Sequence, residues 1–304
     1  MNSARIKAYI MLLVVALSWG IASPIIKYTL DAFDPAVFLA YRYFISTIIA
    51  VVTLFFVKQH LPKKFPDLIL LFIYAFLNSV VSLGLLFFGM QNTTVLDMSL
   101  ITLVGPLIVS ATGVYYFHEK ITKREKIGMA IAVLGVLITI IEPMYLNGNN
   151  TVRFSGNLLV FGNVIVATIT TVISKKLLRN NVNPLLLVNT AFIVGFISFL
   201  AYTLYTNTLD INVIYQTPPI YHFGVLYMAA ISGTLAYYLS TKAQKTIEIS
   251  EQSLFSYLSP IFSMPIAVIW LGEKITPSFI IGAVIIAFGV ALAEIKRTRY
   301  NKTQ

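Results

Sequence analysis

Long uncharged runs separated by short polar breaks are the dominant pattern of this chain. A helix needs about 20 residues to cross the hydrocarbon core of a membrane, and ten runs meet that length. The runs are continuous instead of alternating, which excludes a transmembrane β-barrel. The pattern therefore predicts an all-α polytopic membrane protein with ten transmembrane helices, at Ala8–Leu30, Pro35–Val57, Leu68–Met90, Leu96–Phe117, Ile127–Met144, Phe154–Leu178, Pro184–Thr206, Tyr221–Thr241, Gln252–Leu271 and Pro277–Ile295.

Composition agrees with this pattern. Hydrophobic residues make up 58% of the chain and charged residues 11%, against about 25% charged residues in a soluble domain. The first run, Ala8–Ile26, exceeds the roughly 7–15 apolar residues of a signal peptide, so we expect it to be a retained transmembrane helix. The chain has no cysteine, and its three histidines fall at predicted helix ends without metal-ligand spacing. No metal and no cofactor are therefore predicted.

The positive charges indicate an orientation. With the N-terminus in the cytoplasm, 18 of the 22 Lys and Arg residues fall on the cytoplasmic side and only Arg153 and Lys274 on the other. Cytoplasmic loops of membrane proteins are enriched in Lys and Arg. The distribution predicts a multi-pass plasma-membrane protein with both termini in the cytoplasm. It also explains the net charge of +10 without a nucleic-acid partner.

An internal repeat divides the ten predicted spans into two sets of five. The tetrapeptide "EKIT" occurs at Glu119–Thr122 and again at Glu273–Thr276, and Pro106, Gly128 and Gly135 recur in the same register as Pro260, Gly282 and Gly289. An earlier, weaker match places Lys27 over Lys176. The repeats are predicted at 8–144 and 154–295. Because each holds an odd number of spans, the second must be inverted, an arrangement typical of alternating-access transporters.

The two "EKIT" copies would then lie at opposite membrane surfaces. A Glu beside a Lys could suggest a catalytic pair, but residues on opposite surfaces cannot form one site. Each copy is expected to anchor a tight turn between the two helices that flank it.

The sequence resembles a known family at these positions. The stretches "LSWGIASPIIKYTL", "DPAVFLAYRYF" and "GPLIVSATGVYYFHEKITKREKIGMAIAVLGVLI", with the second copy "SPIFSMPIAVIWLGEKITPSFIIGAVIIAFGVAL", are similar to the EamA-type branch of the drug/metabolite transporter superfamily. The first copy departs by having His118 where the second has Gly272. The resemblance implies ten helices, cytoplasmic termini, a central cavity and export of small metabolites, often amino acids or their relatives. It also implies an arginine at the position of Arg42.

Arg42 is the main candidate for substrate binding. It lies about 10 Å inside the second span at a rise of about 1.5 Å per residue, and a charge at that depth is a functional hypothesis by default. The alternatives are that Arg42 snorkels to the interface or pairs with Asp34. Lys27 is closer to a helix end and snorkels more easily. No carboxylate lies mid-span, so a substrate that carries a carboxylate is favoured over a lipophilic cation.

Uncharged polar side chains inside the spans complete the candidate site. Buried amides and hydroxyls need hydrogen-bond partners, so each could contact either substrate or a neighbouring helix. Trp19 lies mid-span, away from the interfacial belt where Trp usually lies, and could face a cavity or pack against a helix. The predicted substrate-binding residues are Trp19, Arg42, Asn78, Ser82, Asn163, Tyr237 and Ser256.

Glycines and prolines have structural interpretations. Gly128 and Gly135, like Gly282 and Gly289, are seven residues apart and predict close packing of spans five and ten. Pro106, Pro260 and Pro265 interrupt backbone hydrogen bonding in spans four and nine.

The function that fits is a secondary exporter of a small polar metabolite, such as an amino acid or related carboxylate. An exporter of drug-like or cationic compounds is the alternative. A membrane enzyme of lipid metabolism would need a clustered nucleophile, base or metal set, which the sequence lacks, so no enzyme activity is predicted. The expected partners are the substrate and the lipid bilayer, and the sequence leaves open whether the protein is a monomer or a homodimer.

Overall fold

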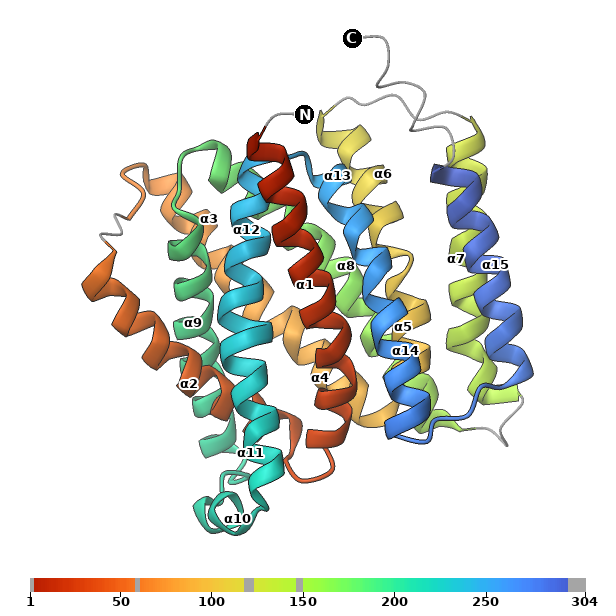
Figure 1. The fold of residues 1–304 in the computed structure, drawn as a ribbon. Helices are drawn as coiled ribbons and strands as arrows, with labels where there is room; N and C mark the ends of the chain where they lie inside the picture. Colours follow the sequence, from red (N-terminus) through yellow and green to blue (C-terminus); the bar gives the residue numbers. More distant parts are fainter. Residues whose placement is uncertain (1–2, 58–60, 118–122, 146–149, 295–304) are drawn as a thin grey trace.

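The computed structural model describes residues 3–57, 61–117, 123–145 and 150–294, and all regular structure in these ranges is helical (Figure 1). The first "EKIT" copy, His60 and His118 lie outside the described residues. The elements are α1 Ser3–Thr29, α2 Pro35–Phe56, α3 Phe65–Phe76, η1 Leu77–Ser82, α4 Leu83–Asn92, α5 Val95–Thr102, α6 Gly105–Phe117, α7 Lys123–Tyr145, α8 Thr151–Arg179, α9 Pro184–Tyr205, α10 Ile211–Gln216, α11 Pro219–Leu226, η2 Tyr227–Leu235, α12 Ala236–Thr246, α13 Ile249–Leu254, η3 Phe255–Leu258, α14 Ser259–Trp270 and α15 Pro277–Glu294.

These elements form nine helices, within the described ranges, that are long and apolar enough to cross a membrane. They correspond to the first nine predicted spans. The tenth, Pro277–Ala293, is apolar but shorter. The predicted loop between α9 and α11 contains the short helix α10, whose first turn is capped by the Asp210 side chain.

Local sequence explains where several helices begin. Pro35 and Pro184 open α2 and α9, as predicted, because the first helical position needs no backbone N–H donor. The side chains of Asp34 and Asn183 accept hydrogen bonds from the exposed N–H groups that follow. Asp34 is therefore engaged as a helix cap, bonded to the backbone N–H of Ala36 at 2.8 Å.

Four of the spans are not continuous α-helices. The fourth is broken between α5 and α6, immediately before Gly105 and Pro106, and the ninth passes through the 3₁₀ turn η3 before Pro260. The predicted proline interruptions are thus confirmed at Pro106 and Pro260, whereas Pro265 lies inside α14. The third and eighth spans contain the π-helices η1 and η2. Wide turns of this kind occur frequently at functional sites.

The predicted glycine contact between α7 and α15 is confirmed. A Cβ atom built on Gly128 would lie 2.5 Å from the backbone nitrogen of Ala293 and 2.6 Å from the carbonyl oxygen of Gly289. A Cβ on Gly135 would lie 2.7 Å from the Ile286 side chain. Only glycine permits this separation, so the two helices lie side by side at one edge of the bundle (Figure 1).

Candidate functional site

A cavity of about 330 Å³ lies inside the helical bundle. Its walls come from α1, α2, the third span, α5 and α6, α8, the eighth span and α13 to α14. Both broken spans and both π-helices contribute residues to it, so the irregular backbone borders the cavity. This volume is at the lower end of the range of small-molecule sites, about 300–1,000 Å³.

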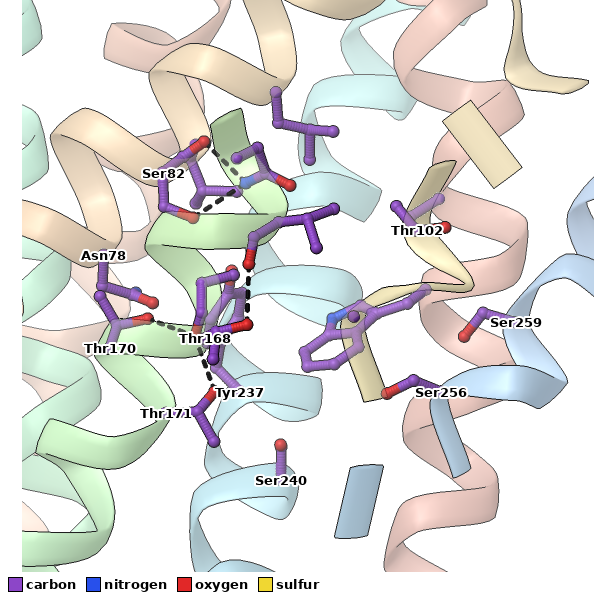
Figure 2. A pocket seen from close by; sticks show the side chains of 18 of the residues that line it. Asn78, Ser82, Thr102, Thr168, Thr170, Thr171, Tyr237, Ser240, Ser256 and Ser259 are labelled. Carbon is purple, nitrogen blue, oxygen red and sulfur yellow. Dashed lines mark hydrogen bonds between the residues drawn. The ribbon is translucent and has the colours of Figure 1, made fainter. Parts of the chain in front are cut away.

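All seven residues predicted to bind substrate line this cavity. Figure 2 shows Asn78 and Ser82 on the other side of the view from Ser256, with Tyr237 between them. The sequence thus predicted which spans and which of their side chains converge, and substrate contact itself stays a prediction. The full set is Trp19, Arg42, Asn78, Ser82, Asn163, Tyr237 and Ser256.

Arg42, on α2, is buried with 1% of its surface exposed. Its Nε and Nη2 atoms have no hydrogen-bond partner among the described residues. The guanidinium carbon lies 5.2 Å from the ring centre of Tyr43 and 5.5 Å from that of Phe87. Both alternatives raised by the sequence are therefore wrong: Arg42 is too deeply buried to snorkel, and Asp34 caps a helix instead.

The aromatic part of the site joins α1 to the eighth span. The indole N–H of Trp19 donates to the Ser232 carbonyl at 3.1 Å, and the indole meets the Tyr237 ring edge-on, with centroids 5.4 Å apart. Trp19 therefore fulfils both proposed roles, because it lines the cavity and also binds a neighbouring helix. Its hydrogen bond uses a carbonyl inside η2.

Asn163 and Ser82 are bonded to each other across two helices. The Asn163 amide donates to the Ser82 carbonyl at 2.8 Å and to its hydroxyl at 2.9 Å. These two side chains thus connect α8 to η1 at the cavity wall. Helix contact, one of the two roles that the sequence left open for them, is confirmed.

Sequence analysis missed a buried lysine at one end of the cavity. Lys175, on α8, is 5% exposed, and its Nζ donates to the carbonyls of Gln244 and Ile247 at 2.7 and 2.5 Å. Gln244 lies in the last turn of α12 and Ile247 is its C-cap residue, so the cation caps the C-terminus of that helix. The Gln244 side chain lines the cavity and accepts from Ser174 at 2.7 Å. Lys175 lies inside the predicted span Phe154–Leu178, near its cytoplasmic end, but was not among the predicted site residues.

Lys27 makes the corresponding contact at the other end. Its Nζ donates to the carbonyls of Met90 and Gln91 at 2.9 and 3.1 Å, at the C-terminus of α4. Lys27 is therefore a helix cap and does not line the cavity. The sequence matched Lys27 with Lys176, whereas the bonds that correspond to those of Lys27 are made by the neighbouring Lys175.

The second "EKIT" copy makes a contact beyond the predicted turn, although Thr276 does cap the following helix by accepting from the Phe279 N–H at 3.1 Å. The Glu273 carboxylate accepts the backbone N–H groups of Val95 and Leu96 at 2.7 and 2.9 Å. It therefore binds the first turn of α5, far away in sequence, and does not simply anchor its own turn. Burial raises the pKa of Glu273, while the two N–H groups and Lys27 oppose that rise. Four exposed N–H groups at a helix start attract a carboxylate.

A buried ionic network lies beside Glu273. Arg153 donates from Nε and Nη2 to the two oxygens of Asp97, both at 2.8 Å, and lies 3.4 Å from Glu142. Asn157 and Ser278 donate to Asp97 and Glu142 respectively. Both carboxylates are buried. Since its residues lie on α5, α7, α8 and α15, the network joins these four helices. Arg153, which directly precedes the predicted span Phe154–Leu178, belongs to the first turn of α8.

Comparison with known proteins gives one family and several relatives. A profile of the EamA-like transporter family matches residues 6–141 and again 154–294. An uncharacterized transporter of Bacillus subtilis, YyaM, is 26% identical, with 98% of this chain and 97% of that protein covered. A probable amino-acid metabolite efflux pump of Salmonella typhimurium is 25% identical, with 94% of both chains covered. A protein of known crystal structure has a TM-score of 0.70 at 14% identity, over 97% of this chain and 99% of that one.

Proposed function

Because the chain belongs to the EamA-like transporter family, we propose that it is a secondary transporter that exports a small polar metabolite, such as an amino acid or related carboxylate. The observation that carries the proposal is the cavity, which receives side chains from both stretches matched by the family profile. Trp19, Arg42 and Asn78 come from the first stretch, and Asn163 and Tyr237 from the second. Transporters of this architecture bind substrate between their two repeats. The Salmonella relative is named a probable amino-acid metabolite efflux pump, which agrees with this substrate class.

The proposed architecture is an inverted pair of five-span repeats in the plasma membrane. Several features support it. The family profile matches twice, a π-helix occurs in the third and eighth spans, and Lys27 and Lys175 cap the third and eighth spans in the same way. In this arrangement α15 is the tenth span, and the Lys and Arg distribution places both termini in the cytoplasm.

Alternating access then follows from the position of the cavity between the repeats. Movement of one repeat against the other would expose the cavity first to one side and then to the other. In the proposed orientation Lys175 lies at the cytoplasmic end and Lys27 at the outer end, so each cap would stabilise a contact that closes one side.

Purified protein in liposomes tests the function. Uptake of neutral amino acids and monocarboxylates should exceed uptake of lipophilic cations, measured as counterflow against internal unlabelled substrate. Movement of lipophilic cations alone would contradict the proposal and support the drug-exporter alternative. Orientation is tested separately. The chain has no cysteine, so Thr208→Cys and Lys63→Cys can be labelled in intact cells, and only Thr208→Cys should react with an impermeant maleimide.

A further inference from the structure

Arg42 is a buried cation whose two donors, Nε and Nη2, are unused among the described residues. A guanidinium stays protonated at any ordinary pH, so burial cannot be relieved by losing the proton. An isolated buried charge is costly, by several kcal/mol. The Tyr43 and Phe87 rings offset only part of that cost through cation–π contact. An anion that reaches Arg42 would therefore gain a strong, desolvated partner.

The geometry of the unused edge identifies the kind of anion. The Nε and Nη2 atoms form one edge of the guanidinium, which presents two parallel N–H groups. The same protein shows what such an edge binds, because Arg153 uses these two atoms to hold both oxygens of Asp97 at 2.8 Å. Arg42 lines the cavity, but both edge atoms are buried in this conformation, so a ligand reaches them once the side chains beside them shift.

The rest of the cavity limits the ligand's charge. Among the described residues that line it, Arg42 is the one charged side chain; the others are apolar, aromatic, hydroxyl or amide groups. A single positive charge matches a single negative charge. A phosphate monoester would bring a second negative charge without a cation, and an ammonium group would find no carboxylate.

We propose that the cavity binds a small monocarboxylate with an otherwise uncharged body, held by its carboxylate on the Nε and Nη2 edge of Arg42. This proposal rests on the proposed transport function and narrows its substrate class. Gly233 packs against the guanidinium, since a Cβ atom at that position would lie 3.2 Å from Nη2 of Arg42. A larger residue there would therefore press on this edge of Arg42.

Binding can be measured with a reporter already inside the cavity. The chain has two tryptophans, and Trp270 lies half-exposed at the end of α14. In a Trp270→Phe background, Trp19 fluorescence reports on the cavity alone. The probes share a hydrocarbon body and differ in the charged group that it carries. The phenyl series is 3-phenylpropanoate, L-phenylalanine, 2-phenylethylamine and 3-phenylpropanamide. A corresponding series has a propyl group as its body, and phenyl phosphate is the phosphate probe.

We expect a carboxylate of at least one body to bind at least tenfold tighter than the zwitterion, amine, amide and phosphate. Arg42→Gln should weaken that binding at least tenfold, and Arg42→Lys less. Arg5→Gln, the same change at an exposed residue paired with Glu251, should leave the Kd unchanged. Equal affinity for zwitterion and carboxylate, no binding of either carboxylate, or an unaltered Kd in Arg42→Gln would overturn the proposal.

Two further measurements on Arg42→Gln complete the test. Its melting temperature shows whether Arg42 has only a structural role, and its transport activity tests the proposed function separately from the binding site. Without ligand, Arg42→Gln should melt at the same or a higher temperature, because it removes an uncompensated charge; a lower melting temperature would indicate a structural role and contradict the proposal. Transport that continues unchanged in Arg42→Gln would leave the proposed function intact and exclude this anchor. Carboxylate binding at Arg42 without any transport would support the binding site and contradict the proposed transport function.

Discussion

The two lysine caps are alike in chemistry and different in setting. Lys27 and Lys175 each bind two carbonyls at the C-terminus of a helix that borders the cavity. Lys175 is nearly fully buried, and the Gln244 side chain beside its bond lines the cavity. Lys27 is only partly buried, and neither Met90 nor Gln91 lines the cavity.

The Lys27 end has additional charged contacts that the described part of the Lys175 end does not have. Glu273 caps α5 there, and Arg153 joins Asp97 to Glu142. At the Lys175 end, Arg179–Glu248 is exposed, and Arg5–Glu251 is exposed at its arginine and partly buried at its carboxylate. Exposed pairs contribute about 0–1 kcal/mol each. The comparison indicates that the Lys27 end is held by buried charged groups of both signs, whereas the described Lys175 end combines one buried cation with neutral hydrogen bonds such as Ser174–Gln244.

The largest effect is expected at Arg153. Arg153→Met leaves Asp97 and Glu142 buried without their cation, and breaking a buried pair in this way costs about 3–5 kcal/mol. The melting temperature in detergent should fall by about five to eight degrees, at roughly 1.6 degrees per kcal/mol for a chain of about 300 residues. Arg179→Met, at an exposed pair, is the control and should change it by about two degrees at most. A small change in Arg153→Met would mean that the network does not stabilise the Lys27 end.

The two lysines come next and test the comparison directly. Hydrogen bonds from a charged group contribute roughly 1.5–3 kcal/mol, and less with solvent exposure. Lys175→Met should therefore cost about 3 kcal/mol and Lys27→Met about 1–2 kcal/mol, measured by denaturant or thermal unfolding.

Two controls define the lysine result. Lys245→Met removes an exposed lysine from the last turn of α12 and should be close to neutral. The double variant Lys27→Met/Lys175→Met should show additive losses if the two caps act independently. A greater loss for Lys27→Met than for Lys175→Met would reverse the order that burial implies.

A smaller effect is expected at Glu273. Glu273→Ala removes both acceptor oxygens from the first turn of α5, so it should cost about 1 kcal/mol, as loss of a helix N-cap does. Glu248→Ala, at an exposed carboxylate at the other end, serves as the control. Equal melting temperatures for both variants would show that the Glu273 cap contributes nothing.

The smallest effect is a pH dependence with a defined sign. Burial holds the pKa of Glu273 above its ordinary value of 4.5, so the folded protein keeps this proton to a higher pH than the unfolded chain does. The contribution is fully present below pH 4.5 and is lost as the pH rises through the raised pKa. The melting temperature of the wild type, taken relative to Glu273→Gln, should therefore fall just above pH 4.5. A rise in that interval would contradict the sign.

Much of the fold was predictable because its signals are local. Apolar length located the spans, and Pro35, Pro184 and the glycines of α7 and α15 acted through backbone rules that depend on few neighbours. The depth of Arg42 in its span was also a local property, and it predicted a buried side chain in the cavity.

The remaining features depend on contacts between distant segments. Nothing near Glu273 indicates that its carboxylate will meet α5, 178 residues away in sequence at Val95. Lys175 is followed by another lysine, and sequence alone does not say which of the two faces the bundle. Helix orientation decides that question, and it requires the packed structure.

The glycine contact between α7 and α15 has a mechanical consequence. No residue described in either helix lines the cavity, yet the two backbones approach so closely that Gly128 has no room for a methyl group. One helix comes from each stretch that the family profile matches. Sliding along such a contact would drive side chains into the opposing backbone, whereas a small rotation about it would not. We therefore expect the two helices to stay in contact and to act as a hinge about which the helices that line the cavity rotate.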